Sequence, residues 1–429
     1  MNHNTTKQFP GRFCLGTAVL LSLCCRLLFQ EAVGAEKLTE SGLKARKKVE
    51  QLKPLMRDGK PFFVIGAYGA PKEIELKSLR EAGWNTILEE ELGNTNAEAI
   101  TQRLSAFNDA GLTGIVGLHD LIFEDKEEEM RTKVRAVRNH PALLGYYLFD
   151  EPENLFYAAA GSKTNTGPKE LDAYIRRKIG WANQSIRGIE PNPEHYTFGC
   201  IAWWNEYRYL QPLCDVNLPN EYPTWNTTNE FEGPNANIVY DARLAAEAAQ
   251  TTGQGFVYTP EAADLLKGVE AWRSPTANEF RYSAFAPFTQ GAMGIIFWTA
   301  NRCSKPYAEK VVFPITRQLS QLVPFFLGKW LDESLVSEPS ESTTALLKQL
   351  KLPAVSGCLR QADDSRYLIL AVNNTPNTVD ATFHLSLKNC PTQGKDFFDG
   401  SKLLIKKGVL KQTLVPYGVC ACIFTPKKH

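Results

Sequence analysis

The acids best placed to do chemistry directly follow a long apolar run. Residues 143–149 read LLGYYLF, and Asp150, Glu151 and Glu153 come next, with Pro152 among them. Seven uncharged residues in a row predict a strand that is buried on both faces, as in a parallel sheet, and Pro152 prevents that strand from continuing. In a parallel α/β barrel this edge carries the reactive side chains. The acids could instead cap a following helix and face the positive end of its dipole.

Apolar runs alternate with helical patterns along most of the chain, and each run is a candidate strand. Eight strand–helix units predict an α/β fold, a (β/α)8 TIM barrel over residues 36–330, with the acids at its carboxyl edge. The eight expected strands are residues 62–68, 84–88, 114–118, 143–149, 196–202, 215–218, 255–258 and 294–298.

The composition changes after Trp330. Residues 331–345 are rich in Ser, Glu and Thr and are typical of a linker. Residues 346–429 contain short alternating segments separated by turn residues such as Asn373-Asn374 and Asp399-Gly400. This pattern predicts a small antiparallel β-sandwich after the barrel.

The first 35 residues are typical of an export signal. Two basic residues precede the apolar run 13–23, which is too short for a stable membrane anchor, and small residues at 33–35 offer a cleavage site. Cys24 and Cys25 directly follow the apolar run, so a lipoprotein signal is the alternative. We expect a signal peptide over residues 1–35 and an exported protein, periplasmic or extracellular.

Charge and motifs exclude several classes of function. Lys and Arg number 48 against 47 Asp and Glu, a formal charge of +1, so no overall field favours nucleic acid or an anionic membrane. No later stretch is long and apolar enough to cross a bilayer. The sequence has no Walker-type phosphate loop, no HExxH and no nucleophile elbow. We therefore expect no cofactor, and the spacing of the acids does not call for a metal.

Several stretches resemble a known group of proteins. HPALLGYYLFDEPE, CDVNLPNEYP and FRYSAFAPFTQGAMGIIFW are similar to glycoside hydrolase-type (β/α)8 barrels of exported bacterial proteins. YLILAVNNTPNTVDATFHL and LVPYGVCACIF resemble the C-terminal β-sandwich that such chains often carry. The resemblance implies a glycosidase, with Glu151 as the general acid/base at the end of the fourth strand. The commonest family pattern has Asn before this glutamate, whereas this chain has Asp150.

Glycoside hydrolysis normally needs a second carboxylate. One carboxyl protonates the leaving oxygen, and an ionised one acts as nucleophile or base. Partial burial and the neighbouring Asp150 charge would raise the pKa of Glu151, which suits the acid. The resemblance places the partner at the end of the seventh strand, where Glu261 is the nearby candidate. Glu261 could equally lie in the first turn of the next helix.

A second mechanism does not require Glu261. Some barrel hydrolases of N-acetylhexosamines carry an Asp-Glu pair on the fourth strand, and Asp150-Glu151 resembles it. There the Asp orients the substrate's acetamido group as nucleophile. Adjacent strand residues point to opposite faces, so both can serve one site only if the strand ends between them, as Pro152 suggests.

Other strand ends offer groups that could bind an oligo- or polysaccharide. Acidic and imidazole groups can bond sugar hydroxyls, and aromatic rings can stack on a pyranose. The alternative for each is packing or a solvated loop. The rival from another class is a carbohydrate-binding barrel that does not catalyse. The candidate binding residues are Glu90 (from the run Glu89 to Glu91), His119, Asp120, Trp203, Tyr222 and Trp298.

Overall fold

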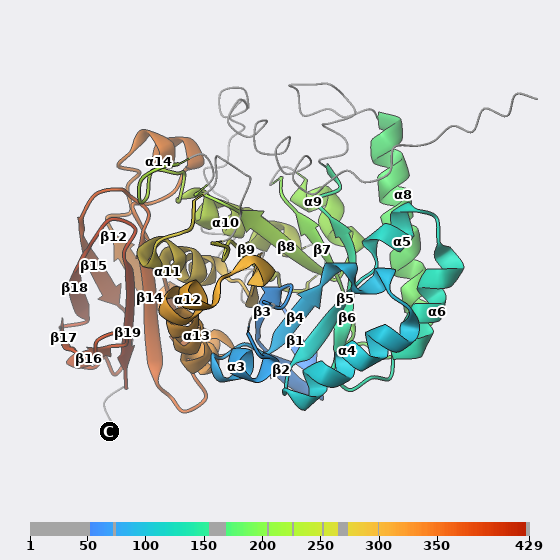
Figure 1. The fold of residues 1–429 in the computed structure, drawn as a ribbon. Coiled ribbons are helices and arrows are strands. Elements are labelled where there is room, and N and C mark those ends of the chain that lie inside the picture. The colour runs from blue at the N-terminus through green and yellow to red at the C-terminus, as the bar shows by residue number, and fades with distance from the viewer. Residues whose placement is uncertain are drawn as a thin grey trace, which may run out of the picture.

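The computed structural model describes residues 52–71, 74–153, 169–203, 206–224, 227–250, 253–264, 273–298 and 300–425. The expected signal peptide, residues 1–35, lies outside them. Figure 1 shows a parallel barrel surrounded by helices, with a second sheet packed on one side of it. Across the described part of the chain, no helix combines the length and the apolar character that a membrane span requires.

Eight parallel strands form the barrel, in the order β10-β3-β4-β5-β6-β7-β8-β9. Parallel bridges between Tyr258 and Ile295 and between Glu261 and Trp298 close it. The predicted TIM barrel is therefore confirmed. The seventh strand begins later than expected, because regular pairing with β8 starts only at Thr259. The strands are β3 (Val64–Tyr68), β4 (Thr86–Glu89), β5 (Thr113–Gly117), β6 (Leu143–Asp150), β7 (Tyr196–Ile201), β8 (Val216–Glu221), β9 (Thr259–Pro260) and β10 (Gly294–Phe297).

The helices bury their apolar faces against the outside of the barrel. In the α4 helix Ile100, Leu104 and Phe107 are buried, a spacing that places all three on one face. Asn96 caps α4 by accepting from the Ala99 N–H. The helices are α3 (Leu76–Glu81), α4 (Ala97–Asp109), α5 (His119–Phe123), α6 (Glu127–Val137), α8 (Lys169–Arg187), α9 (Tyr207–Leu210), α10 (Asn237–Ala249), α11 (Ala277–Phe285), α12 (Lys305–Tyr307), α13 (Phe313–Phe326) and α14 (Ala345–Leu350).

The barrel interior is apolar and closed at its amino end. A hairpin of β1 (Leu55–Arg57) and β2 (Lys60–Phe62) covers that end. Leu55 belongs to the interior cluster, and the Met56 N–H donates to the Tyr196 hydroxyl (2.7 Å). The carboxyl end, where the acids follow β6, is therefore the mouth of the barrel.

An antiparallel β-sandwich follows the barrel, as predicted. Its strand order is β11-β13-β14-β19-β16-β17-β18-β15-β12. The stretch 331–345 is not a simple linker, because it contains β12, which pairs with β15. The strands are β11 (Lys329–Trp330), β12 (Leu335–Glu338), β13 (Val355–Gln361), β14 (Tyr367–Asn373), β15 (Val379–Leu385), β16 (Gln393–Asp396), β17 (Lys402–Lys406), β18 (Val409–Leu414) and β19 (Val419–Phe424).

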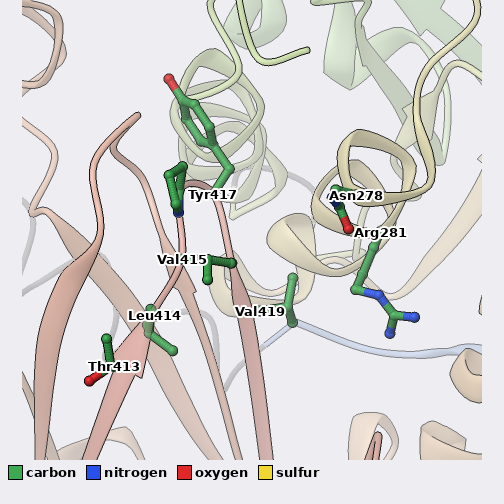
Figure 2. Close-up of a pocket in the computed structure, with 9 residues that line it drawn as sticks. Asn278, Arg281, Thr413, Leu414, Val415, Tyr417 and Val419 are labelled. Atoms are coloured by element: carbon green, nitrogen blue, oxygen red, sulfur yellow. The ribbon is translucent and has the colours of Figure 1, made fainter.

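A small cavity lies where the sandwich meets α11 (Figure 2). It holds about 190 Å³ and is lined by Asn278 and Arg281 of α11 and by residues 413–419. Arg281 lies over the Phe398 ring and donates to Gln318 Oε1 (2.8 Å). This cavity belongs to the junction, since its lining does not come from the strand ends of the barrel.

Candidate active site

A bulge in β6 brings two polar groups to the same face of one strand. Tyr147 lies in the interior cluster, whereas Phe149 packs in the outer cluster beneath the helices. The register with β7 shifts between these two residues, since Tyr147 pairs with Phe198 and Phe149 with Gly199. The extra residue in β6 changes which side chains point into the barrel, so Asp150 lies on the same side as Tyr147. The Tyr147 hydroxyl donates to Asp150 Oδ1 (2.7 Å).

Glu151 sits at a sharp turn at the end of β6. Its φ is 44°, in the left-handed region that side chains other than glycine rarely adopt. Its N–H still bonds the Cys200 carbonyl of β7 (3.0 Å). The strand thus ends between Asp150 and Glu151, and both partly exposed carboxyls lie at the mouth. The neighbouring charge of Glu151 acts directly on Asp150.

One short segment contacts both predicted catalytic glutamates. Asn220 of β8 donates to Glu151 Oε1 (2.5 Å), and the Thr224 hydroxyl donates to Glu261 Oε2 (2.5 Å). Glu261 is 3% exposed and lies in a bridge opposite Trp298, so it extends the strand and does not begin a helix. Since residues 220 to 224 span at most about 14 Å, the two glutamates lie at one end of the barrel.

An aromatic pair lies at the same strand ends. The rings of Tyr222 and Trp298 are stacked, with centroids 4.3 Å apart and planes at 23°. Tyr222 is buried and Trp298 is partly exposed, so of the two residues Trp298 is the more accessible. The Asn220 amide also donates to the Tyr222 hydroxyl (2.8 Å). Tyr222 therefore supports both Trp298 and the Asn220–Glu151 contact.

The opposite rim carries an imidazole between two acids. Glu90 begins a 3₁₀ helix, η1 (Glu90–Asn94), and His119 begins α5. His119 Nε2 lies 3.3 Å from Glu90 Oε1 and 3.2 Å from Asp120 Oδ1. Burial lowers the pKa of His119, but Glu90, Asp120 and Asp150 outweigh it and leave that pKa raised. Within the described ranges, no three His, Cys, Asp or Glu side chains are grouped to hold a metal ion.

The surroundings of Asp150 favour its protonated form. Burial, followed by the charges of Glu90 and Glu151, raises the pKa of Asp150 to about 8. The Tyr147 hydrogen bond and His119 act in the opposite direction but do not cancel the rise. The Asp150 carboxyl is thus disposed to carry a proton at the mouth, beside Glu151, where acid/base chemistry would use one.

Glu153 is a buried residue whose partners the sequence does not reveal. It is 0% exposed, and its Oε1 accepts from the N–H groups of Ala202 (2.5 Å) and Trp203 (3.0 Å). Burial and the Glu151 charge raise the pKa of Glu153 to about 8. The side chain thus ties the end of β6 to the end of β7. Trp203, expected at the rim, is 5% exposed, and Trp204 lies outside the described residues.

The sequence alone did not identify Asn220 and Thr224 as site residues. It also did not reveal that Tyr147 holds Asp150 or that Tyr222 supports Asn220. Asn220 lies inside a short strand, and Tyr147 lies inside an apolar run, so neither position stands out locally. A weak signal was available in the segment NEYPT, which places polar side chains around Tyr222 directly after a strand.

Comparison with known proteins supports the fold. No family model matches the sequence, and no curated protein matches it. Three solved structures similar to this chain are a glycoside hydrolase, a catalytic mutant of a family 42 β-galactosidase from G. stearothermophilus, and a family 5 glycoside hydrolase from Bacteroides vulgatus. Their TM-scores are 0.56, 0.55 and 0.54, and their identities 11%, 11% and 12%. Each alignment covers 88% of this chain, and 96%, 100% and 92% of the other chain respectively. The chain thus has the fold of glycoside hydrolases, a (β/α)8 barrel with a C-terminal antiparallel sheet.

Proposed function

We propose that the protein is a glycoside hydrolase that acts on an oligo- or polysaccharide at the barrel mouth. Glu151 is the general acid/base, and Glu261 is the second carboxylate. The contact of segment 220–224 with both side chains is the observation that carries this proposal. The structural likeness to a β-galactosidase and a family 5 glycoside hydrolase supports it at the level of fold.

The geometry suggests how the two glutamates divide the work. Glu151 is partly exposed, so a glycosidic oxygen can reach its carboxyl and take a proton from it. Glu261 is buried and held by Thr224, an arrangement suited to a fixed nucleophile or base. Trp298, which is partly exposed, could offer the sugar an apolar surface. Retention of the anomeric configuration would assign Glu261 as nucleophile, and inversion would assign it as base.

Asp150 provides a second route, in which the substrate's acetamido group is the nucleophile. This route is favoured by the turn at Glu151, which brings the adjacent carboxyls to one mouth. This route needs the ionised carboxylate of Asp150 as acceptor for the acetamido N–H, and since the pKa of Asp150 is raised to about 8, the ionised fraction should grow as pH rises towards that value. Comparing aryl N-acetylhexosaminides with the parent aryl hexosides separates the routes, because only the acetamido route requires the acetamido group.

The proposal is tested with the wild type and a Glu151→Gln variant on a panel of aryl glycosides. Loss of the general acid/base is expected to lower kcat/KM by about 10²- to 10⁴-fold. Glu128→Gln is the matched control, because Glu128 is an exposed acid on α6, with 82% of its side chain accessible. An unchanged rate in the Glu151→Gln variant would remove Glu151 from the catalytic role.

A carbohydrate-binding protein without turnover is the alternative outcome of this test. In that case glycans would raise the melting temperature of the wild type while no aryl glycoside is hydrolysed. We also propose that the protein is exported, periplasmic or extracellular, on the basis of residues 1–35 of the sequence.

A further inference from the structure

Two tyrosine hydroxyls lie beneath Asp150 in the barrel interior. The Tyr147 hydroxyl donates to Asp150 Oδ1 (2.7 Å), and the Tyr68 hydroxyl donates to the Tyr147 hydroxyl (3.4 Å). Their rings meet edge to face, with centroids 5.8 Å apart and planes at 89°. Tyr68 ends β3 and Tyr147 lies in β6, which are not neighbours in the barrel. The pair therefore links distant strands across the interior.

Both hydroxyls are shielded from water and remain protonated. Tyr147 is 0% exposed and Tyr68 is 5% exposed, and both belong to the apolar interior cluster. Burial, followed by the charge of Asp150, raises the pKa of each phenol well above its usual value. Each hydroxyl therefore keeps a proton that it can donate, and the printed contacts run from Tyr68 through Tyr147 to Asp150.

We propose that Tyr147, supported by Tyr68, is a positioning residue that fixes the orientation and the charge of Asp150 beside Glu151. This inference deepens the proposed function and rests on it for one consequence, the effect on turnover. Neither tyrosine contacts the sugar in this account. Each acts only through Asp150, because the Tyr147 hydroxyl is the group that holds that carboxyl.

The surroundings of Asp150 determine what loss of the hydroxyl would do. Burial, Glu90 and Glu151 favour the protonated carboxyl, whereas the Tyr147 hydroxyl and His119 favour the ionised one. Tyr147→Phe removes one of the two groups that favour ionisation, so the carboxyl should keep its proton to higher pH. The titratable groups that interact with Asp150 are Glu90, His119, Glu151, Tyr68, Tyr147, Cys200 and Tyr222.

The test is a direct titration of Asp150 in the full chain. Aspartate labelled with ¹³C at the side-chain carboxyl is followed by NMR across pH, and the Asp150 signal is identified by its loss in Asp150→Asn. Tyr147→Phe is expected to raise the titration midpoint by about one pH unit, as removal of one hydrogen bond to a carboxylate should. Tyr68→Phe should shift the midpoint in the same direction by less.

Tyr146→Phe is the matched control. Tyr146 is a buried tyrosine on the same strand, but it belongs to the outer cluster and donates to Glu190 (2.8 Å). This variant also loses one phenol hydroxyl from β6, yet it should leave the titration midpoint of Asp150 unchanged. The proposal is overturned if Tyr147→Phe leaves the midpoint in place, or if Tyr146→Phe moves it equally.

Turnover distinguishes this inference from the proposed function. If both hold, the pH profile of kcat/KM shifts with the NMR midpoint in Tyr147→Phe and stays in place in Tyr146→Phe. A shifted midpoint in a protein that hydrolyses no glycoside would support the tyrosine chain and contradict the proposed function. A shifted midpoint with an unshifted pH profile would contradict the link from Asp150 to Glu151.

Discussion

Glu153 illustrates how burial changes the chemistry of a single residue. Its Oε1 accepts two backbone N–H groups, while its Oε2 is buried and meets no hydrogen-bond partner within the described residues. Burial and the Glu151 charge raise its pKa from 4.5 to about 8. Between these pH values the folded protein binds a proton that the unfolded chain releases. The stability of the fold should therefore decrease as pH rises through this window.

Glu153→Gln should remove this pH dependence. Glutamine keeps an oxygen for the N–H groups of Ala202 and Trp203 but does not titrate. The variant should be close to the wild type in free energy of unfolding at pH 5, and more stable than the wild type at pH 8 by on the order of 3 kcal/mol. Urea unfolding at both pH values measures this difference. If the free energies of unfolding of the two proteins change in parallel with pH, Glu153 is ionised in the folded protein and the prediction is wrong.

At the scale of elements, the β6 bulge depends on a space in β7. A Cβ atom at Gly199 would lie 2.0 Å from the Phe149 ring, closer than any real contact. The ring of Phe149 therefore occupies the position that a side chain on β7 would take. This packing places Phe149 outside the barrel and Asp150 inside it, so the glycine determines where the carboxyl pair points.

Gly199→Ala is expected to displace Phe149 and disturb the bulge. The variant should lose about 1–3 kcal/mol of stability, as overpacked cores do, and should also lose turnover. Gly180→Ala is a suitable control. Gly180 lies in the α8 helix, and a Cβ atom there would meet only Leu213, at 3.9 Å. That change should leave turnover intact and stabilise the helix by up to about 1 kcal/mol. Thermal unfolding together with aryl glycoside rates tests both, and wild-type behaviour of Gly199→Ala would contradict the account.

Local patterns predict the elements well but not the contacts between them. Apolar segments predicted most barrel strands, because a strand buried on both faces needs little else, but the seventh strand was expected at residues 255–258 and lies at Thr259–Pro260. The β12 strand was missed because its alternation, Leu335–Glu338, lies in a stretch rich in Ser and Glu. The partners of Glu153 and Tyr147 were also missed, since both depend on the bulge and on the neighbouring strand. Such long-range register is not encoded in any short segment.

At the scale of the whole molecule, the sandwich is packed onto the barrel through side chains. The Tyr282 hydroxyl of α11 donates to Asn374 Oδ1 (3.1 Å). The rings of Phe285 and Phe398 meet edge to face, with centroids 5.5 Å apart. Figure 1 shows α11, α12 and α13 beside the second sheet. Because of these contacts, we expect the two parts to unfold together.

Phe398→Ala tests this coupling. The variant removes the ring that Phe285 and Arg281 contact from the barrel side, and should cost about 2–4 kcal/mol because the ring is partly buried. Calorimetry should give a single transition at lower temperature than in the wild type, with turnover unchanged below it. Two separate transitions in the wild type would show that the barrel and the sandwich unfold independently.

The central claim is that Glu151 and Glu261 serve one site, and a double-mutant cycle tests it most directly. The cycle compares kcat/KM of the wild type, Glu151→Gln, Glu261→Gln and the double variant on one aryl glycoside that the wild type hydrolyses. Groups that act as a unit are not additive. Each single change should cost about 10²- to 10⁴-fold, and the double variant should be no slower than the slower single variant. A Glu261→Gln variant at the wild-type rate, or a double variant slowed by the product of the two single effects, would contradict the claim.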